Sequence, residues 1–316
     1  MMPITQLKLI EEAVKGSQQM TLAVAAAEDP ATIHAVAKAA IAGLMRVILV
    51  GDRAKICELS DGFDSRFLRD AEIIHIEDEV EAGNAAVQLV HNGQAQVLMK
   101  GLIGTSTFMK AVLDKDFGLL PKGNLLSHVA VMEIPSYPKL IIVSDAAIIP
   151  NPDMNDKVQI LNYAVHVGHI LGIEKPKVAM ISAAEKINFR LQSSVDAAVI
   201  KAMADRHQIE GAIVDGPLAL DVSLSEHHCK VKGLESPING SADVLIFPNI
   251  ETANTFYKSA TILAGGKTAA VVVGAKAPIV LTSRADDDDS KYFSILLALL
   301  MASRKQVKPT VSSHDE

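Results

Sequence analysis

Short apolar segments alternate with segments of helical periodicity along nearly the whole of this 316-residue sequence. The apolar segments are short enough to be buried strands, and the segments between them repeat apolar residues at the spacing of an amphipathic helix. This alternation is typical of right-handed βαβ units, which predicts an α/β fold with mainly parallel sheets. We expect strands at residues 21–26, 46–50, 73–76, 97–99, 129–134, 140–143, 178–182, 212–214, 244–247, 269–273 and 279–281. We expect helices near residues 4–15, 30–43, 79–92, 106–115, 155–171, 190–206, 251–264 and 288–303.

The composition supports this class of fold. Apolar residues make up 49% of the chain and charged residues 21%, whereas aromatic residues account for 4% and Trp is absent. Aliphatic side chains therefore dominate the core, which favours parallel-sheet packing over a β-sandwich. The net charge of −7 argues against a nucleic-acid partner, because neutralising phosphates requires clustered Lys and Arg. A local basic pocket for a small anion stays compatible with that charge.

Several features indicate the cellular setting. Cys57 and Cys229 are far apart and form no CxxC motif, which fits a reducing compartment. Residues 1–16 have the pattern of an amphipathic helix rather than that of a secretion signal. The most apolar segment, residues 293–302, is about ten residues long and too short to span a bilayer. We therefore expect a soluble cytoplasmic protein with no membrane partner.

One connection breaks the parallel pattern. The expected strands 129–134 and 140–143 are separated by a short segment, 135–138, that contains two prolines and cannot hold a crossover helix. This pair is predicted to form an antiparallel hairpin. Such a change in strand direction often marks a second sheet, so we place a domain change near residues 126–129. The last strand and helix, residues 278–303, then either return to the first domain or cap the second.

The most informative motif lies near the carboxyl terminus. A short buried strand, residues 279–281, is followed by Thr282, Ser283 and Arg284, then by aspartates at 286–289, and then by a helix. The carboxyl ends of strands are where α/β proteins bind ligands and perform chemistry. Acidic residues before a helix also serve as ordinary N-caps and favourable charges for the helix dipole. On spacing alone, both interpretations of the aspartates stay open.

A second segment is suited to anion binding. Lys100 follows the expected strand 97–99 and is followed by Gly101 and Gly104, and Thr105 and Ser106 open the next helix. Glycines let the backbone approach a ligand, and the free N–H groups of a helix start bind anions. We expect Thr105 or Ser106 to cap this helix and Lys100 to add a positive charge. The lysine precedes the glycines, so the segment is not a Walker A loop.

Two further segments carry polar groups at strand ends. Ser144 follows an expected strand and is a candidate for substrate binding. Asn254, Tyr257 and Lys258 are spaced to share one face of a helix that follows a strand and a turn. His166 and His169 have a spacing seen in metal sites, but no third ligand accompanies them, so we expect no metal site.

Together these segments resemble the phosphate acetyl/butyryltransferase family, and its butyryltransferase branch in particular. The resemblance covers nearly the whole chain in order, and seven successive motifs make it specific. The motifs are VLMKGLIGTSTFMKAVL (97–113), SHVAVMEIP (127–135), SDAAIIPNPD (144–153), KVAMISAAEKIN (177–188), IVDGPLALD (213–221), SADVLIFPNIETANTFYK (241–258) and PIVLTSRADD (278–287).

The resemblance implies a reversible reaction in which acyl-CoA and orthophosphate give acyl phosphate and CoA. It implies a two-domain α/β fold related to isocitrate dehydrogenase, with the second domain (128–270) inserted into the first (1–127 and 271–316) and the active cleft between them. It also implies a homodimer or a higher homo-oligomer, with CoA and phosphate as substrates and no metal or nicotinamide cofactor.

The family resemblance extends to the catalytic group. Ser283 and Arg284 match its catalytic serine and arginine, which are accompanied by a downstream aspartate. In the acetyltransferase branch that aspartate lies seven residues after the serine, where this chain has Ser290. Our first candidate for the base is therefore Asp286 and our second is Asp289. By the same resemblance, phosphate or the rest of the cleft is contacted by Lys100, Thr105, Ser106, Asn249, Asn254 and Lys258.

Other activities are compatible with parts of the pattern. Within the family, the alternative is a phosphate acetyltransferase. An isocitrate-dehydrogenase-like oxidoreductase shares the expected fold but requires a carboxylate cluster for a divalent metal and a nicotinamide pocket. A two-domain ligand-binding protein of the periplasmic type, or a phosphate acyltransferase that works on acyl carrier protein, are the remaining alternatives.

Overall fold

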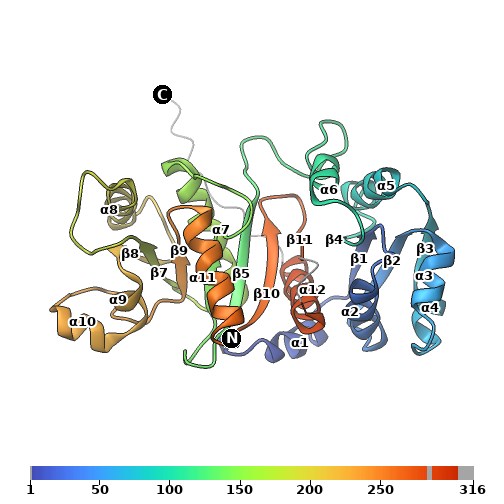
Figure 1. Cartoon of the computed structure of the whole chain (residues 1–316), viewed down its shortest axis with the longest axis horizontal. Helices are drawn as coiled ribbons and strands as arrows, with labels where there is room; N and C mark the ends of the chain where they lie inside the picture. Colours follow the sequence, from blue (N-terminus) through green and yellow to red (C-terminus); the bar gives the residue numbers. More distant parts are fainter. Residues whose placement is uncertain (1, 283–286, 305–316) are drawn as a thin grey trace.

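The computed structural model describes residues 2–282 and 287–304, and these residues form a single mixed sheet covered by helices (Figure 1). The sheet has eleven strands in the order β3-β2-β1-β4-β11-β10-β5-β6-β9-β7-β8. The strands are β1 (Met20–Ala25), β2 (Met45–Gly51), β3 (Glu72–His75), β4 (Val97–Lys100), β5 (Ser127–Glu133), β6 (Ile141–Ser144), β7 (Lys177–Ile181), β8 (Ile213–Leu218), β9 (Val244–Ile246), β10 (Lys267–Val273) and β11 (Ile279–Val280).

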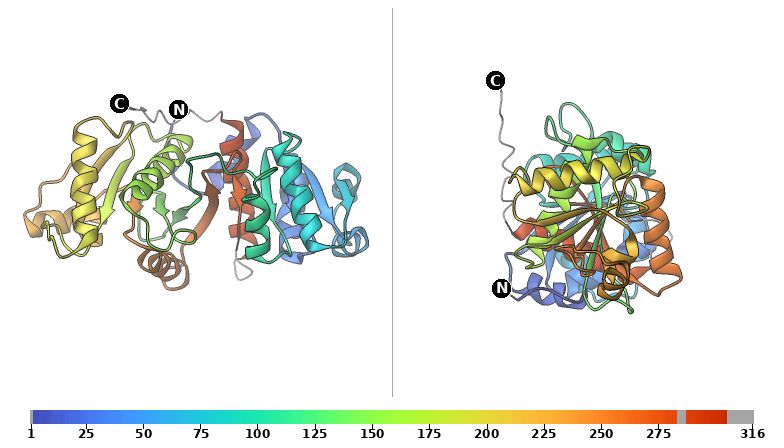
Figure 2. Two further views of the ribbon diagram at one scale, coloured as in Figure 1. Left: turned by 90° about the horizontal axis from the view of Figure 1, so that it is seen from above. Right: turned by 90° about the vertical axis from the view of Figure 1, so that its left-hand side faces the viewer.

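The helices lie on both faces of this elongated sheet (Figure 2). They are α1 (Lys8–Lys15), α2 (Pro30–Ile41), α3 (Arg53–Leu59), α4 (Arg66–Asp70), α5 (Glu79–His91), α6 (Thr105–Val112), α7 (Met154–Ile170), α8 (Gln192–Asp205), α9 (Leu220–Leu224), α10 (Glu226–Lys232), α11 (Ile250–Ile262) and α12 (Asp288–Ser303). Within the described residues, no helix is both long enough and apolar enough to cross a membrane.

The antiparallel pairing is confined to the centre of the sheet. Among the described strands, seven neighbouring pairs are parallel, and the three antiparallel pairs join β11, β10, β5 and β6. The predicted hairpin is therefore confirmed, because β5 pairs with β6 in the antiparallel sense. The mainly parallel α/β class is confirmed as well. The kinship with isocitrate dehydrogenase stays a prediction.

Alternating side chains of the strands supply three apolar cores. On one face, Val271 of β10 belongs to a core with α1, α2, α7, α8 and α12. On the other face, Val272 packs with α5 and α6, whereas Ala270 packs with α9, α10 and α11. Successive residues of a strand point to opposite faces, so one strand can serve all three cores. The second face thus carries two separate helical layers.

Strand order places the last strand and helix beside the amino-terminal half. β11 pairs with β4, and α12 packs on α1 and α2. Tyr292 of α12 donates a hydrogen bond from its hydroxyl to Glu11 Oε2 at 3.0 Å, which fastens α1 to this helix. The sheet runs without a break from β3 to β8, and the predicted domain change near residues 126–129 coincides with the start of β5. The assignment of residues 128–270 to an inserted domain stays a prediction.

Candidate active site

The strand end at Lys100 is held tightly to its neighbours. Lys100 is 7% exposed, and its ammonium donates hydrogen bonds to the carbonyls of Gly101 and Ile103, both at 3.0 Å. The backbone N–H of Gly101 donates to Ala25 O at 2.9 Å, which ties this loop to the end of β1. A Cβ at Gly101 would lie 2.1 Å from Ala26 O. The close approach of two backbones therefore requires glycine at this position.

This contact gives a matched pair of variants. Gly101→Ala is expected to lower the free energy of unfolding by about 1–3 kcal/mol, because backbone atoms must shift. Gly104→Ala is the control, because its Cβ meets Thr107 Oγ1 at an ordinary 3.5 Å. Thermal unfolding of the two variants measures the difference. Equal effects of both substitutions would contradict this account of the loop.

Helix α6 begins differently from our expectation. Gly104 occupies its N-cap position and no side chain accepts a hydrogen bond there, so the prediction that Thr105 or Ser106 caps the helix is wrong. Both residues instead lie in the first turn with exposed side chains. The first N–H groups of the helix therefore have no side-chain cap and lie at the positive end of its dipole. The segment therefore offers donors suited to an anion.

The loop after β6 is fixed by buried hydrogen bonds. Ser144 is fully buried, and its hydroxyl donates to His128 O at 2.9 Å and lies 3.1 Å from Ser127 Oγ. The carboxylate of Asp145 accepts from the backbone N–H groups of His128, Ala147 and Ile148 at 2.8 to 2.9 Å. These contacts join β5 to the loop. A direct contact of Ser144 with substrate stays a prediction.

Helix α11 packs against the same loop. Asn249 is its N-cap, with a side chain that accepts from the N–H of Thr252 at 3.0 Å. Asn254 donates from Nδ2 to Ala146 O at 3.0 Å, and Lys258, one turn further along, is exposed. Asn249 and Asn254 therefore shape the site through the backbone. Of the three predicted residues in this segment, Lys258 has the side chain most available to a ligand.

The aspartate run before α12 divides into separate roles. Ser283, Arg284 and Asp286 lie outside the described residues, which resume at Asp287. Asp287 is the N-cap of α12, and the hydroxyl and N–H of Ser290 donate to its carboxylate, which lowers its pKa. The predicted capping function of part of this run is therefore confirmed.

The two aspartates that follow are ion-paired with other elements. Asp288 Oδ2 lies 2.7 Å from His34 Nδ1. Asp289, our second candidate for the base, lies 3.5 Å from the ammonium of Lys38 and 3.6 Å from that of Lys267. The side chains of these three pairs are about half exposed, so the pairs add little to stability. They do orient the first turn of α12 against α2 and β10.

The predicted residues fall into two groups. Lys100, Thr105 and Ser106 lie at the end of β4, whereas Ser144 and the three residues of α11 lie on the other side of β10 and β5 (Figure 1). No hydrogen bond or ion pair between described residues joins the groups directly. Thr282 lies between the two groups in the order of the sheet, because it follows β11, which lies between β4 and β10. Sequence reasoning missed Thr268, whose polar side chain on a buried strand was the available signal.

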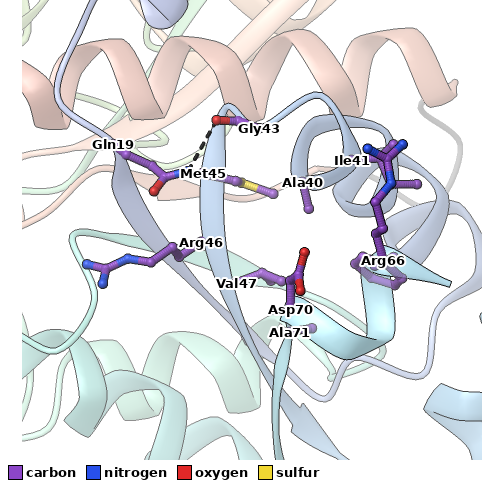
Figure 3. A pocket seen from close by; sticks show the side chains of 11 residues that line it. Gln19, Ala40, Ile41, Gly43, Met45, Arg46, Val47, Arg66, Asp70 and Ala71 are labelled. Atoms are coloured by element: carbon purple, nitrogen blue, oxygen red, sulfur yellow. Dashed lines mark hydrogen bonds between the residues drawn. The ribbon is translucent and has the colours of Figure 1, made fainter. Parts of the chain in front are cut away.

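Two cavities of the described structure lie elsewhere. One, of about 290 Å³, is at the amino ends of β1 and β2, where Gln19 Nε2 donates to Gly43 O at 3.2 Å (Figure 3). Another, of about 250 Å³, is at the amino ends of β4 and β11 and includes His166. Neither contains a predicted site residue. The strand ends, which carry the polar groups, therefore define the candidate site better than these cavities do.

Comparison with known proteins identifies the class. The sequence matches the family described as phosphate acetyl/butaryl transferase over residues 75–299. The phosphate butyryltransferase of Clostridium acetobutylicum is 43% identical over 294 residues, which cover 92% of this chain and 96% of the relative. The chain belongs to the phosphate acetyl/butyryltransferase family.

Other members differ in the acyl group for which they are named. The phosphate acetyltransferase of Thermotoga maritima is 40% identical over 296 residues, or 93% of this chain and 99% of the relative. The crystal structure of a branched-chain phosphotransacylase from Enterococcus faecalis V583 superposes with a TM-score of 0.79 at 33% identity, covering 90% of this chain and 99% of that one. Fold and sequence therefore agree on the class of protein.

Proposed function

We propose that this protein catalyses the reversible transfer of a short-chain acyl group, butyryl in the first place, between CoA and orthophosphate. The observation that carries the proposal is the identity of 40–43% with phosphate acyltransferases along nearly the whole chain. The helix start at α6 supports the proposal, because its first N–H groups have no side-chain cap and are donors suited to phosphate. Butyryl is preferred because the relatives from Clostridium acetobutylicum and Clostridium beijerinckii are named for it.

The reaction can be assigned to residues step by step. Toward acyl-CoA, a base removes the proton of the CoA thiol, and the thiolate attacks the carbonyl carbon of the acyl phosphate. The C–S bond forms, the C–O bond to phosphate breaks, and phosphate leaves with the electron pair. Arg284 and Ser283 stabilise the oxyanion and the leaving phosphate. Lys100 and the first N–H groups of α6 bind the phosphate.

We assign the base to an aspartate of the run before α12. Asp286 is preferred to Asp289, because the carboxylate of Asp289 is already engaged by two ammonium groups. An acyl-enzyme on Ser283 is less favoured, since the sequence pattern provides no histidine base for that serine. Asp286→Asn is expected to lower kcat far more than Asp289→Asn does.

The acyl preference can be measured directly. Acetyl-, propionyl-, butyryl- and isobutyryl-CoA should each release thiol only when phosphate is present, with the highest kcat/KM for butyryl-CoA. One methylene contributes about 1–3 kcal/mol of discrimination, so the expected ratio between adjacent chain lengths is about ten- to two-hundredfold. A maximum at acetyl-CoA would establish the alternative, a phosphate acetyltransferase, which the Thermotoga maritima relative supports.

Further properties belong to the same proposal. We infer a cytoplasmic homodimer or higher homo-oligomer that needs no metal or nicotinamide, as the family resemblance implies. Light scattering after gel filtration tests the oligomer. Full activity after treatment with a chelator, and no change in absorbance at 340 nm with NAD(P) and a 2-hydroxy acid, would support the acyltransferase over an oxidoreductase.

A further inference from the structure

Three hydroxyl groups form a line across the middle of the molecule. Tyr257 Oη of α11 lies 3.1 Å from Thr268 Oγ1 of β10. Thr268 Oγ1 in turn donates to Ser290 Oγ of α12 at 3.4 Å. This line of hydrogen bonds therefore connects α11, through β10, to the first turn of α12.

Ser290 connects these hydroxyl groups to the start of α12. Thr268 has one hydroxyl proton and donates it to Ser290, so along this line the hydroxyl of Tyr257 donates to Thr268. The carboxylate of Asp287, the N-cap of α12, accepts from the N–H of Ser290 at 2.7 Å. Hydroxyl groups that are hydrogen-bonded in series polarise and strengthen one another.

Burial and neighbouring contacts hold the line in place. Thr268 is 2% exposed, so water cannot readily replace its partners. The ring of His128 meets the ring of Tyr257 edge-on, with centroids 6.1 Å apart and an interplanar angle of 86°. A second hydrogen bond joins β10 to α12 beside the line. In it, Ala270 N donates to Ser294 Oγ at 2.9 Å.

We propose that Tyr257 and Thr268 are positioning residues for acyl transfer, which act through Ser290 on Asp287 and the start of α12. The inference rests on the proposed function, in which Ser283 and Arg284 immediately precede this helix start in the sequence. Asp287 is three residues from Arg284. The residues that approach this helix start from α11 and β10 therefore hold the first turn of α12, which follows the catalytic segment in the sequence.

Small displacements of catalytic groups have large effects on rate. A misplacement of about 1 Å can reduce turnover about a hundredfold. Loss of one hydroxyl contact allows a smaller shift, so we expect each of Tyr257→Phe and Thr268→Val to lower kcat about tenfold. The KM for acyl-CoA should change less than kcat, because neither side chain is assigned to substrate binding.

A double-mutant cycle distinguishes positioning from independent structural damage. The double variant Tyr257→Phe/Thr268→Val should be no slower than the slower single variant, because both substitutions break the same line. Thr268→Ser keeps the hydroxyl and should restore kcat. Thr261→Val is the control on α11, since its hydroxyl donates to Lys258 O and takes no part in the line. If Thr268→Val does not fold, Ser290→Ala takes its place in the cycle.

A second readout is independent of activity. Carbon-detected NMR of the Asp287 carboxyl should show its pKa rising toward the ordinary value in Thr268→Val, and further in Ser290→Ala. If the losses of kcat in the two single variants multiply in the double variant, or if both single variants keep the wild-type kcat, the positioning role is overturned and the proposed function is not affected. A wild-type protein that releases no thiol from acyl-CoA in the presence of phosphate would instead overturn the proposed function on which it rests.

Discussion

Arg284→Ala is expected to lower kcat by about a hundred- to a thousandfold, the cost of removing a group that stabilises charge in the transition state. Ser283→Ala should lower kcat in the same direction, because its hydroxyl is assigned to the same oxyanion. The free energy of unfolding should change little in either variant. Thiol release from butyryl-CoA, measured beside a thermal unfolding curve, gives both quantities.

His169 provides the matched control for this experiment. Its side chain is exposed at the end of α7, and Nε2 lies 2.8 Å from Gly211 O, in the connection between α8 and β8. His169→Ala should therefore retain the wild-type kcat. Near-normal turnover in both the serine and the arginine variants would remove them from the catalytic group.

Lys157→Met is expected to cause the largest loss of stability. Lys157 of α7 and Asp196 of α8 form an ion pair at 2.6 Å, with side chains that are 6% and 4% exposed. Removing one partner leaves a buried carboxylate that keeps only the bond from Gln192 Nε2 at 2.7 Å. The expected cost is about 3–5 kcal/mol in the free energy of unfolding, read from urea denaturation.

Two variants separate the charge effect from the loss of side-chain packing. The double substitution Lys157→Met/Asp196→Leu should recover most of the lost stability, because no unpaired charge remains buried. Lys201→Met breaks the exposed pair with Asp205 on α8 and should cost less than about 0.5 kcal/mol. A similar cost for Lys157→Met and Lys201→Met would show that burial of the pair is unimportant.

The fold could be predicted to a large extent because its signals are local. Each expected strand corresponds to one of β1 to β11, and the short connection at 135–138 identified the antiparallel β5–β6 pair. The helices α3, α4, α9 and α10 were missed because each has five to seven residues, too few to show a helical period. The expected strand 212–214 was too short, because β8 continues through Pro217 to Leu218. β8 is an edge strand, where proline is tolerated.

The candidate site was harder to predict, because most of its contacts join distant parts of the sequence. The loop at Lys100 could be recognised from its glycines, but the cap of α6 was assigned to Thr105 or Ser106 although Gly104 occupies that position. The pairing of Asp288 with His34 spans 254 residues and leaves no local pattern. Tyr257 and Thr268 are 11 residues apart, but they lie on different elements, α11 and β10, so their hydrogen bond leaves no local pattern either.

The most direct test of the proposed function is to identify both products of the forward reaction. Phosphorus NMR of the protein with butyryl-CoA and orthophosphate should show an acyl phosphate resonance that grows in proportion to free CoA thiol. The reverse reaction, from butyryl phosphate and CoA, should consume thiol until the same equilibrium is reached. Thiol release without an acyl phosphate would show hydrolysis rather than transfer and would contradict the account.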